Sequence, residues 1–231
     1  MSDSDYFNFE NKELDFPFYN NNPHVSKMGW IVLIISMFVS FLVLGLSSNE
    51  IKGGILFCSI LLIAVLHYLD WDYKAIFQRP KKSEIKLAVL LFVGYIVYAV
   101  IVGSVLDLLS LSGSGVVSES SVTIYTLISL FPSLMGEELF KFIPFMLFMR
   151  LIYKFSNNRK VSITISMILV MLFFALLHLM DLQSLVSVIA IQGFGSIFEF
   201  YGYIKTKNLW IPYITHLCTD LILFSVILFA L

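Results

Sequence analysis

Residues 85–109 read IKLAVLLFVGYIVYAVIVGSVLDLL, and this run decides which class of fold the chain can adopt. A helix needs about 20 residues to cross the hydrocarbon core of a bilayer, and this run is long enough. The chain has 231 residues, of which 58% are hydrophobic and only 13% charged, so a single soluble core could not bury its apolar surface. Further apolar runs occupy residues 28–46, 53–71, 123–154, 161–180, 184–204 and 209–231.

These runs predict an all-α, polytopic transmembrane helical bundle with seven or eight membrane helices. Helices are required because an open sheet edge would leave backbone groups without hydrogen bonds in lipid. The number depends on the run at 123–154, which is too long for one simple span. It contains Pro132, Gly136 and Pro144, which can break or kink a helix.

Lys and Arg residues predict the orientation of the bundle. They gather at 72–86, 150–160 and 205–207, which we expect to be cytoplasmic. The loop 110–122 carries Glu119 and no basic residue, so we expect it to lie outside. Two full crossings within 123–154 would place a basic loop outside. We therefore expect a re-entrant or half-helical piece at 123–135, followed by a spanning helix.

The chain divides into three expected regions. Residues 1–27 form an acidic cytoplasmic tail without the basic start of a secretory signal. Residues 28–110 form the N-terminal transmembrane helices, and residues 115–231 form a helical core that carries the polar residues. In the tail, we expect four aromatic side chains to touch the membrane surface: Phe7, Phe9, Phe16 and Phe18.

Overall charge and cysteine content exclude other classes of function. The net charge of −1 gives no electrostatic reason to expect nucleic acid as a partner. Cys58 and Cys218 lie inside apolar runs, so they are interpreted as small core residues and not as a disulfide framework or a metal site. The lipid bilayer is the first partner that the composition implies.

Ionisable residues inside spans indicate where chemistry occurs, because a charge at the middle of a membrane helix costs about 2.5–3.5 kcal/mol on insertion scales. After residue 123 the spans contain seven such residues: Glu137, Glu138, Lys141, His178, Glu199, His216 and Asp220. Earlier spans contain His67 and Asp70 near a predicted cytoplasmic end and, at the two ends of the run 85–109, Lys86 and Asp107. The candidate site therefore belongs to the C-terminal half.

Glu137 and Glu138 are neighbours, and Lys141 lies on the same helical face as Glu137. Two adjacent carboxylates in a low dielectric cannot both ionise cheaply, and one that keeps a proton can exchange it with water. The alternative is that both acids open a helix and favour the positive end of its dipole.

Two further pairs show helical spacing. His178 follows Phe174 at i+4, and Asp220 follows His216 at i+4, where a carboxylate can orient the imidazole. As alternatives, His178 is an interfacial residue with a satisfied hydrogen bond, and the His216–Asp220 pair is structural. Glu199 is interpreted as a snorkelling or structural residue.

Several protease patterns are absent. The chain has no HExxH for a zinc site and no GxGD for an aspartyl site. Gly113, Ser114 and Gly115 lie in the expected outer loop, which argues against a rhomboid-like serine. Cys218 and His216 point to different faces of one helix, so a Cys–His dyad there is disfavoured.

As an ordered set, these residues resemble the three motifs of the Abi family, also called CPBP, which comprises CAAX proteases and bacteriocin-processing enzymes. The first is Glu137-Glu138-x-x-Lys141, the second Phe174-x-x-x-His178, and the third His216-x-x-x-Asp220. The lead-in to the third also follows the family, at Gly195, Tyr203, Thr206, Leu209, Trp210 and Pro212.

The resemblance has departures. The family's first motif is usually EExxxR, but here the base is Lys141, as in the EExxK motif of the related PrsW-type membrane proteases. Lys cannot make the planar bidentate contacts of Arg, so Lys141 must support the site through different contacts from those of the family's Arg. The third motif commonly ends in Asn, and here it ends in Asp220.

The resemblance implies an intramembrane endopeptidase that cleaves a peptide or a membrane-associated protein. By analogy, Glu137 is the water-activating base supported by Glu138, His178 shares that water, and His216 donates to the oxyanion. Lys141, Phe174 and Asp220 support them. We expect no metal cofactor, because adjacent glutamates chelate one ion awkwardly; the alternative is zinc held by the same Glu and His residues.

Two classes of function stay open from the sequence. The first is a protease that processes a bacteriocin, a pheromone precursor or another small secreted peptide, as the resemblance implies. The second is a non-catalytic bacteriocin self-immunity protein that acts by binding, in which the motif residues are structural. Alanine at Glu137 would separate them, because only the protease needs that carboxylate.

Overall fold

The computed structural model describes residues 10, 14–19, 23–111, 122–179 and 181–230, and all regular structure in them is helical. The helices are α1 (Lys27–Leu46), α2 (Glu50–Tyr68), α3 (Lys82–Leu108), α4 (Ile124–Ser156), α5 (Arg159–Leu177), α6 (Leu185–Val188), α7 (Ile197–Thr206) and α8 (Trp210–Ala230). A 3₁₀ turn, η1 (Tyr73–Ala75), follows α2, and a π-helical stretch, η3 (Ile189–Phe194), joins α6 to α7. The expected all-α bundle is confirmed.

Polar side chains mark where several of these helices begin. Ser26, Asn49, Thr123 and Asn158 each accept a hydrogen bond from a backbone N–H of the first turn. Such caps satisfy N–H groups that have no partner inside the helix. Six helical segments are long and apolar enough to cross a membrane, which confirms a multi-pass membrane protein.

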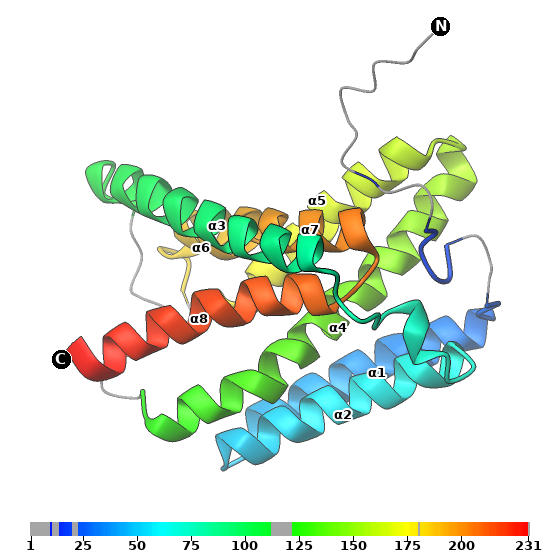
Figure 1. Cartoon of the computed structure of the whole chain (residues 1–231), viewed down its shortest axis with the longest axis horizontal. Helices are drawn as coiled ribbons and strands as arrows, with labels where there is room; N and C mark the ends of the chain where they lie inside the picture. The colour runs from blue at the N-terminus through cyan, green and yellow to red at the C-terminus, as the bar shows by residue number, and fades with distance from the viewer. Residues whose placement is uncertain (1–9, 11–13, 20–22, 112–121, 180, 231) are drawn as a thin grey trace, which may run out of the picture.

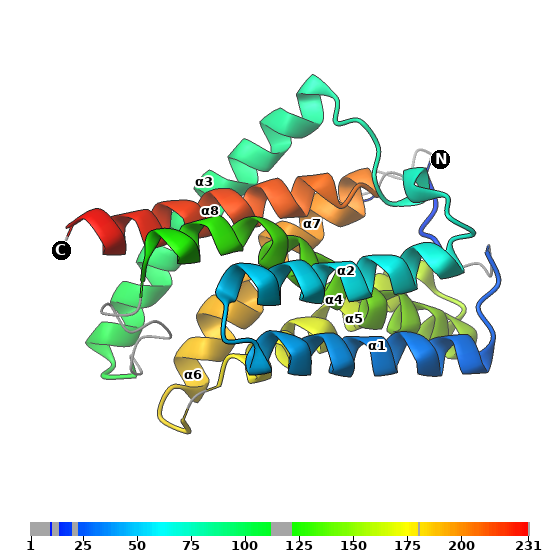
Figure 2. The same cartoon turned by 90° about the horizontal axis from the view of Figure 1, so that it is seen from below.

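Helix α4 runs diagonally through the middle of the bundle (Figure 1). It packs against α2 and α5 along its length and also contacts α8, while α3 and α7 cover the other side of α8. In Figure 1 the α1–α2 hairpin lies below α4, and Figure 2 shows α1 and α2 running side by side with α8 above both. Because it touches so many neighbours, α4 is the element that positions the site.

The expected break in the 123–154 run is wrong. Helix α4 is one continuous helix of 33 residues that passes through Pro132 and Pro144. Each proline removes the helical hydrogen bond to the carbonyl four residues earlier, that of Ile128 or Phe140. A separate bond of 3.1 Å, from the Tyr213 hydroxyl of α8 to the carbonyl of Phe131, ties this part of α4 to its neighbour. Packing against α2, α5 and α8 holds the helix, so the run forms one unbroken helix instead of a half-helical piece followed by a second helix.

Two glycines allow α2 and α4 to approach closely. A side chain at Gly54 would collide with Ser133 of α4, and one at Gly136 would collide with the ring of Phe57 of α2. Small residues at such a crossing let helix backbones pack directly in a membrane. This contact fixes the rotation of α4 about its axis and therefore the direction in which Glu137 and Glu138 point.

The segments with basic residues gather at one end of the bundle. Leu209, before α8, donates from its backbone to Ile76 after η1, and Asn208 exchanges two hydrogen bonds with the backbone of Gln78. Lys207 and Arg159 meet at the same end through the carboxylate of Glu10. The three basic segments therefore lie at one end of the bundle, which agrees with the prediction that they lie on the same side of the membrane. That this side is the cytoplasmic one stays a prediction.

Residues 14–19, here called the N-terminal strap, lie across this basic end, with Glu10 before them. Phe16 and Phe18 are only 2% and 1% exposed. Phe16 packs against the rings of Phe145 and Tyr203, and Phe18 packs against Trp30 and Phe142. The expectation that Phe16 and Phe18 touch the membrane surface is therefore wrong; Phe7 and Phe9 lie outside the described residues, as does most of the loop 110–122.

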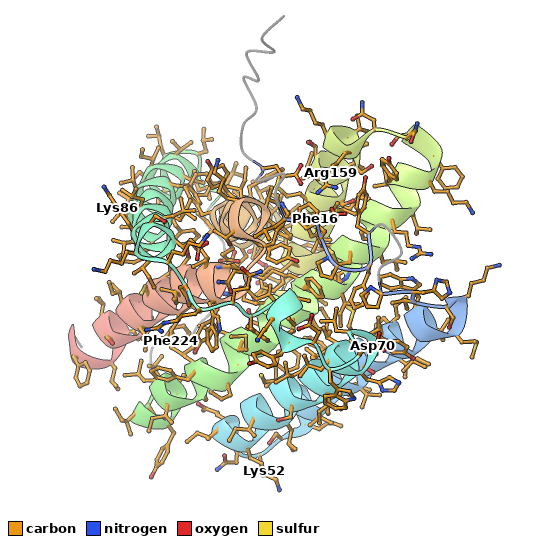
Figure 3. All side chains as sticks on the ribbon, turned by 45° about the vertical axis from the view of Figure 1, so that its right-hand side comes forward. Phe16, Lys52, Asp70, Lys86, Arg159 and Phe224 are labelled. Carbon is orange, nitrogen blue, oxygen red and sulfur yellow. The ribbon has the colours of Figure 1, made fainter. Side chains whose placement is uncertain are left out.

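Charge explains why the strap docks. Arg159 donates to both carboxylate oxygens of Glu10, the closest at 2.5 Å, and to Asp15 at 2.6 Å. Lys207 lies 3.2 Å from Glu10, and burial lowers the pKa of Lys207 to about 8, which leaves its ammonium protonated at neutral pH. Figure 3 shows Phe16 and Arg159 at this end of the molecule. The acidic segment is thus an ion-pair partner of the basic loops.

We expect Phe16→Ala to lower the free energy of unfolding by about 3–5 kcal/mol, because it removes a fully buried ring from an aromatic layer. The measurement is denaturant unfolding of the purified protein in detergent. Phe155→Ala, at an 86% exposed position, is the matched control and should change little. Equal effects from the two variants would contradict the docked position of the strap.

Candidate active site

A buried ammonium lies at the centre of the candidate site. The Nζ of Lys141 on α4 forms ion pairs with Glu138, at 2.6 Å, and with Glu199 on α7. The three residues are 3%, 4% and 7% exposed in that order. A charged group in such surroundings needs a partner, and here one cation serves two carboxylates from two helices.

His216 on α8 completes this group. Its Nδ1 lies 2.9 Å from Oε1 of Glu138 and 3.8 Å from Oε1 of Glu199. Because a carboxylate accepts, Nδ1 carries the proton and donates it to Glu138. The other nitrogen, Nε2, then points toward Glu137 at 4.0 Å and Asp220 at 3.7 Å. Glu138 therefore fixes the orientation of the ring.

His178 joins the site from the end of α5. Its ring lies 4.6 Å from the ring of Phe174, and Phe174 in turn lies beneath the ammonium of Lys141, 4.7 Å from the ring centre. Nδ1 of His178 is 3.0 Å from the carbonyl oxygen of Phe174, which can only accept. In the neutral ring, Nε2 is therefore the free acceptor. Asp220 lies within electrostatic range of His178.

The geometry brings together the residues that the sequence singled out. Glu138, His216 and Lys141 are in direct contact, Glu137 and Asp220 flank Nε2 of His216, and Phe174 connects His178 to Lys141. One pairing differs from the i+4 expectation, because Lys141 pairs with Glu138 at i+3. Glu199 draws the ammonium to that side of α4, so the side chain of Glu137 stays 24% exposed.

Glu199 is the site member that the sequence interpretation missed. Of the two interpretations of Glu199, snorkelling is wrong and a structural role agrees with its position, since it is buried and bonded to Lys141. One signal was available: away from the helix ends, the C-terminal spans hold four acids, and Lys141 is the one Lys or Arg among them. Which of the four acids it would bind depends on how α7 packs.

A small cavity of about 20 Å³ adjoins the ion pairs. Its lining combines the three charged residues with an apolar layer: Glu138, Lys141, Glu199, Phe142, Phe145, Phe200, Tyr203 and Leu209. This volume holds about one water molecule. Phe16 and Phe18 of the strap contact the outer side of this layer, so the strap separates the charges from the basic end of the bundle.

Within the described residues, one group of side chains has the spacing of a metal site: Glu138, Glu199 and His216, whose potential ligand atoms lie within 4.8 Å of one another. This set does not fit a cation while Lys141 is in place, because its ammonium already binds the two carboxylates. It also differs from the zinc alternative, which used Glu137 and His178 together with Glu138 and His216.

The part of the chain that carries the site matches the sequence model of a known protein family. Residues 118–222 match the family model described as type II CAAX prenyl endopeptidase Rce1-like. This range contains all the residues of the site, and the match confirms the resemblance to the Abi, or CPBP, proteases. No curated protein and no solved structure matches the chain.

We expect Lys141→Met to lower the free energy of unfolding by about 3–5 kcal/mol, because it leaves two buried carboxylates without a cation. Adding Glu199→Gln should recover part of this loss, with a coupling energy of about 1–3 kcal/mol in a double-mutant cycle. The measurement is denaturant unfolding of the three variants in detergent.

Glu50→Gln with Lys52→Met is the matched control cycle, because these residues lie at the exposed start of α2 and do not face each other. Their effects should add. Additive effects of Lys141→Met and Glu199→Gln would show that the central ion pair does not hold α4 to α7.

Proposed function

We propose that this chain, which matches the Rce1-like CAAX endopeptidase family over residues 118–222, is an intramembrane protease that activates water with a glutamate. The observation that carries the proposal is the different surroundings of two adjacent glutamates. Glu138 is engaged by Lys141 and His216, whereas Glu137 is partly exposed and faces Nε2 of His216.

The surroundings assign different tasks to the two carboxylates. Glu138 accepts from a buried ammonium and an imidazole, so it is held as a structural anion. Among the described residues Glu137 has no cation closer than His216, which leaves its oxygens free to bind water. A general base must reach the proton that it removes directly or through one water, and the exposed carboxylate meets this condition.

In the proposed reaction, Glu137 takes a proton from water while the water oxygen bonds to the carbonyl carbon of the scissile peptide. The free Nε2 of His178 accepts the second hydrogen bond of that water. The proton held by Glu137 then passes to the amide nitrogen as the C–N bond breaks. The products are a carboxylic acid and an amine, so one water is consumed for each bond cleaved.

His216 is proposed to stabilise the negative charge on the carbonyl oxygen. To donate from Nε2 while Nδ1 donates to Glu138, the ring must carry both protons. The carboxylates of Glu138 and Asp220 flank such an imidazolium. A donor held in place before the reaction is worth several kcal/mol to the transition state.

The substrates proposed for this site are peptides that reach it from the bilayer or its surface. The site residues lie on α4, α7 and α8 and at the end of α5, and α5, α7 and α8 belong to helical segments that are long and apolar enough to cross a membrane. In line with the resemblance, small secreted precursors such as bacteriocins or pheromones are the proposed class. Self-immunity by cleavage of such a peptide is the corresponding biological role.

We expect Glu137→Gln to lower the rate of peptide cleavage at least 100-fold without a change in thermal stability, because the amide cannot accept a proton from water. The assay follows cleavage of candidate precursor peptides by the protein in lipid nanodiscs, using mass spectrometry. Glu50→Gln is the matched control. A protein that acts only by binding would keep its protective effect in cells with Glu137→Gln.

We also propose that the reaction needs no metal, because Lys141 occupies the space between the carboxylates that a cation would use. Dialysis against a strong chelator should then leave cleavage unchanged. A zinc enzyme would lose turnover and regain it with added zinc, since its metal generates the hydroxide. Metal content and cleavage rate, measured on the same samples, distinguish the two mechanisms.

A further inference from the structure

A second cavity, near the basic end, lies apart from the catalytic residues. It has a volume of about 650 Å³, in the range of ligand pockets. Helices α2, α4 and α8 and the segment after α2 form its walls, and Figure 2 shows α2 and α8 on opposite sides of α4, with η1 near their ends. Its lining residues are Leu62, Leu66, Tyr73, Lys74, Phe77, Gln78, Arg79, Met135 and Trp210.

The lining is divided into an apolar and a cationic part. Leu62 and Leu66 lie within the last two turns of α2, and Met135 belongs to α4, so these side chains line the part within the bundle. Lys74 and Arg79 belong to the segment outside the helices and are both exposed. Within the described part of the chain, neither forms an ion pair with a carboxylate.

Aromatic side chains place this part of the cavity at the membrane boundary. Trp71 and Tyr73 are 60% and 54% exposed beside the end of α2. Trp210, at the start of α8, lines the cavity and packs against Phe77, with the ring centres 5.3 Å apart. Trp and Tyr gather at the level of lipid headgroups, so the two cations lie where phosphates are found.

The cavity is not a position from which a substrate could reach the catalytic base. None of Glu137, His178, His216 and Asp220 lines it. Met135 lies two residues before Glu137, which rotates its side chain by about 200° around α4. A peptide seated against Met135 would lie on the opposite face of the helix from the carboxylate of Glu137.

We propose that this cavity binds an anionic glycerophospholipid, with an acyl chain against Leu62, Leu66 and Met135 and the phosphate between Lys74 and Arg79. An apolar tail and a negative head match the two parts of the lining, and a guanidinium binds phosphate oxygens in pairs. Segment 70–82 contains four basic residues, Lys74, Arg79, Lys81 and Lys82, against Asp70 and Asp72. This inference does not depend on the peptidase activity.

Fluorescence of Trp210 tests the proposal directly. The chain has three Trp residues, so Trp30→Phe with Trp71→Phe leaves Trp210 as the only reporter. This variant is placed in vesicles of phosphatidylcholine that contain, at equal mole fraction, either brominated phosphatidylglycerol or brominated phosphatidylcholine. We expect stronger quenching by the brominated anionic lipid, because each cation near the surface contributes roughly a fivefold preference.

The charge variant Lys74→Gln with Arg79→Gln should lose this preference. Lys81→Gln with Lys82→Gln removes the same charge from neighbouring positions that do not line the cavity, and it should keep the preference. Thermal stability of each variant shows that the fold is intact.

Three results would overturn the proposal. Equal quenching by the two lipids before any charge is removed would show that the cavity has no headgroup preference. Equal loss in both charge variants would indicate diffuse surface charge instead of a binding site. Quenching by both lipids that is relieved by a short apolar peptide with a free carboxyl terminus would assign the cavity to peptides.

Discussion

The buried ion pair between Lys141 and two glutamates is the interaction on which the rest of the structure depends. A lone ammonium or carboxylate at this depth is costly in lipid, so α4 and α7 are stable only when they lie together. The bond from His216 to Glu138 extends the same constraint to α8. Three helices that lipid alone would not drive together are thereby held in one arrangement.

This constraint also separates the roles of neighbouring residues. Glu137 and Glu138 have the same chemistry and differ only in direction, about 100° apart around α4. Glu138 faces Lys141 and His216, while the side chain of Glu137 is 24% exposed and lies 4.0 Å from Nε2 of His216. Enzymes often obtain two functions from two carboxylates by giving them different surroundings. Here the close crossing of α2 and α4 at Gly54 and Gly136 sets those directions.

The sequence was most informative where hydrophobicity alone determines structure. The seven apolar runs correspond to seven helical segments. Helical spacing placed Lys141 beside Glu137 and Asp220 beside His216, whereas both Lys141 and His216 bind Glu138. Helix α4 was predicted to break because a proline lowers helix stability locally, whereas packing against α2, α5 and α8 is a tertiary effect. The ionisable residues of the site could be identified from the sequence, but the residue that each of them contacts could not.

Two further misses have the same cause. Glu199 gives no local signal of its contact with Lys141, because 58 residues separate them. The strap likewise looked like a solvated tail, since its partners Arg159 and Lys207 lie in the second half of the chain. Long-range ion pairs depend on which helix ends meet, and local composition does not encode that information.

The position of the strap has a consequence for biogenesis. Glu10 is separated by 149 residues from Arg159 and by 197 residues from Lys207. At a synthesis rate of about 5–20 residues per second, the first partner leaves the ribosome on the order of ten seconds or more after the strap. Phe16 and Phe18 must therefore wait, shielded by lipid or a chaperone, while the four helices α1 to α4 that precede Arg159 are made. Closure of the aromatic layer is thus a late step of assembly, and it requires that both ends of the chain have been made.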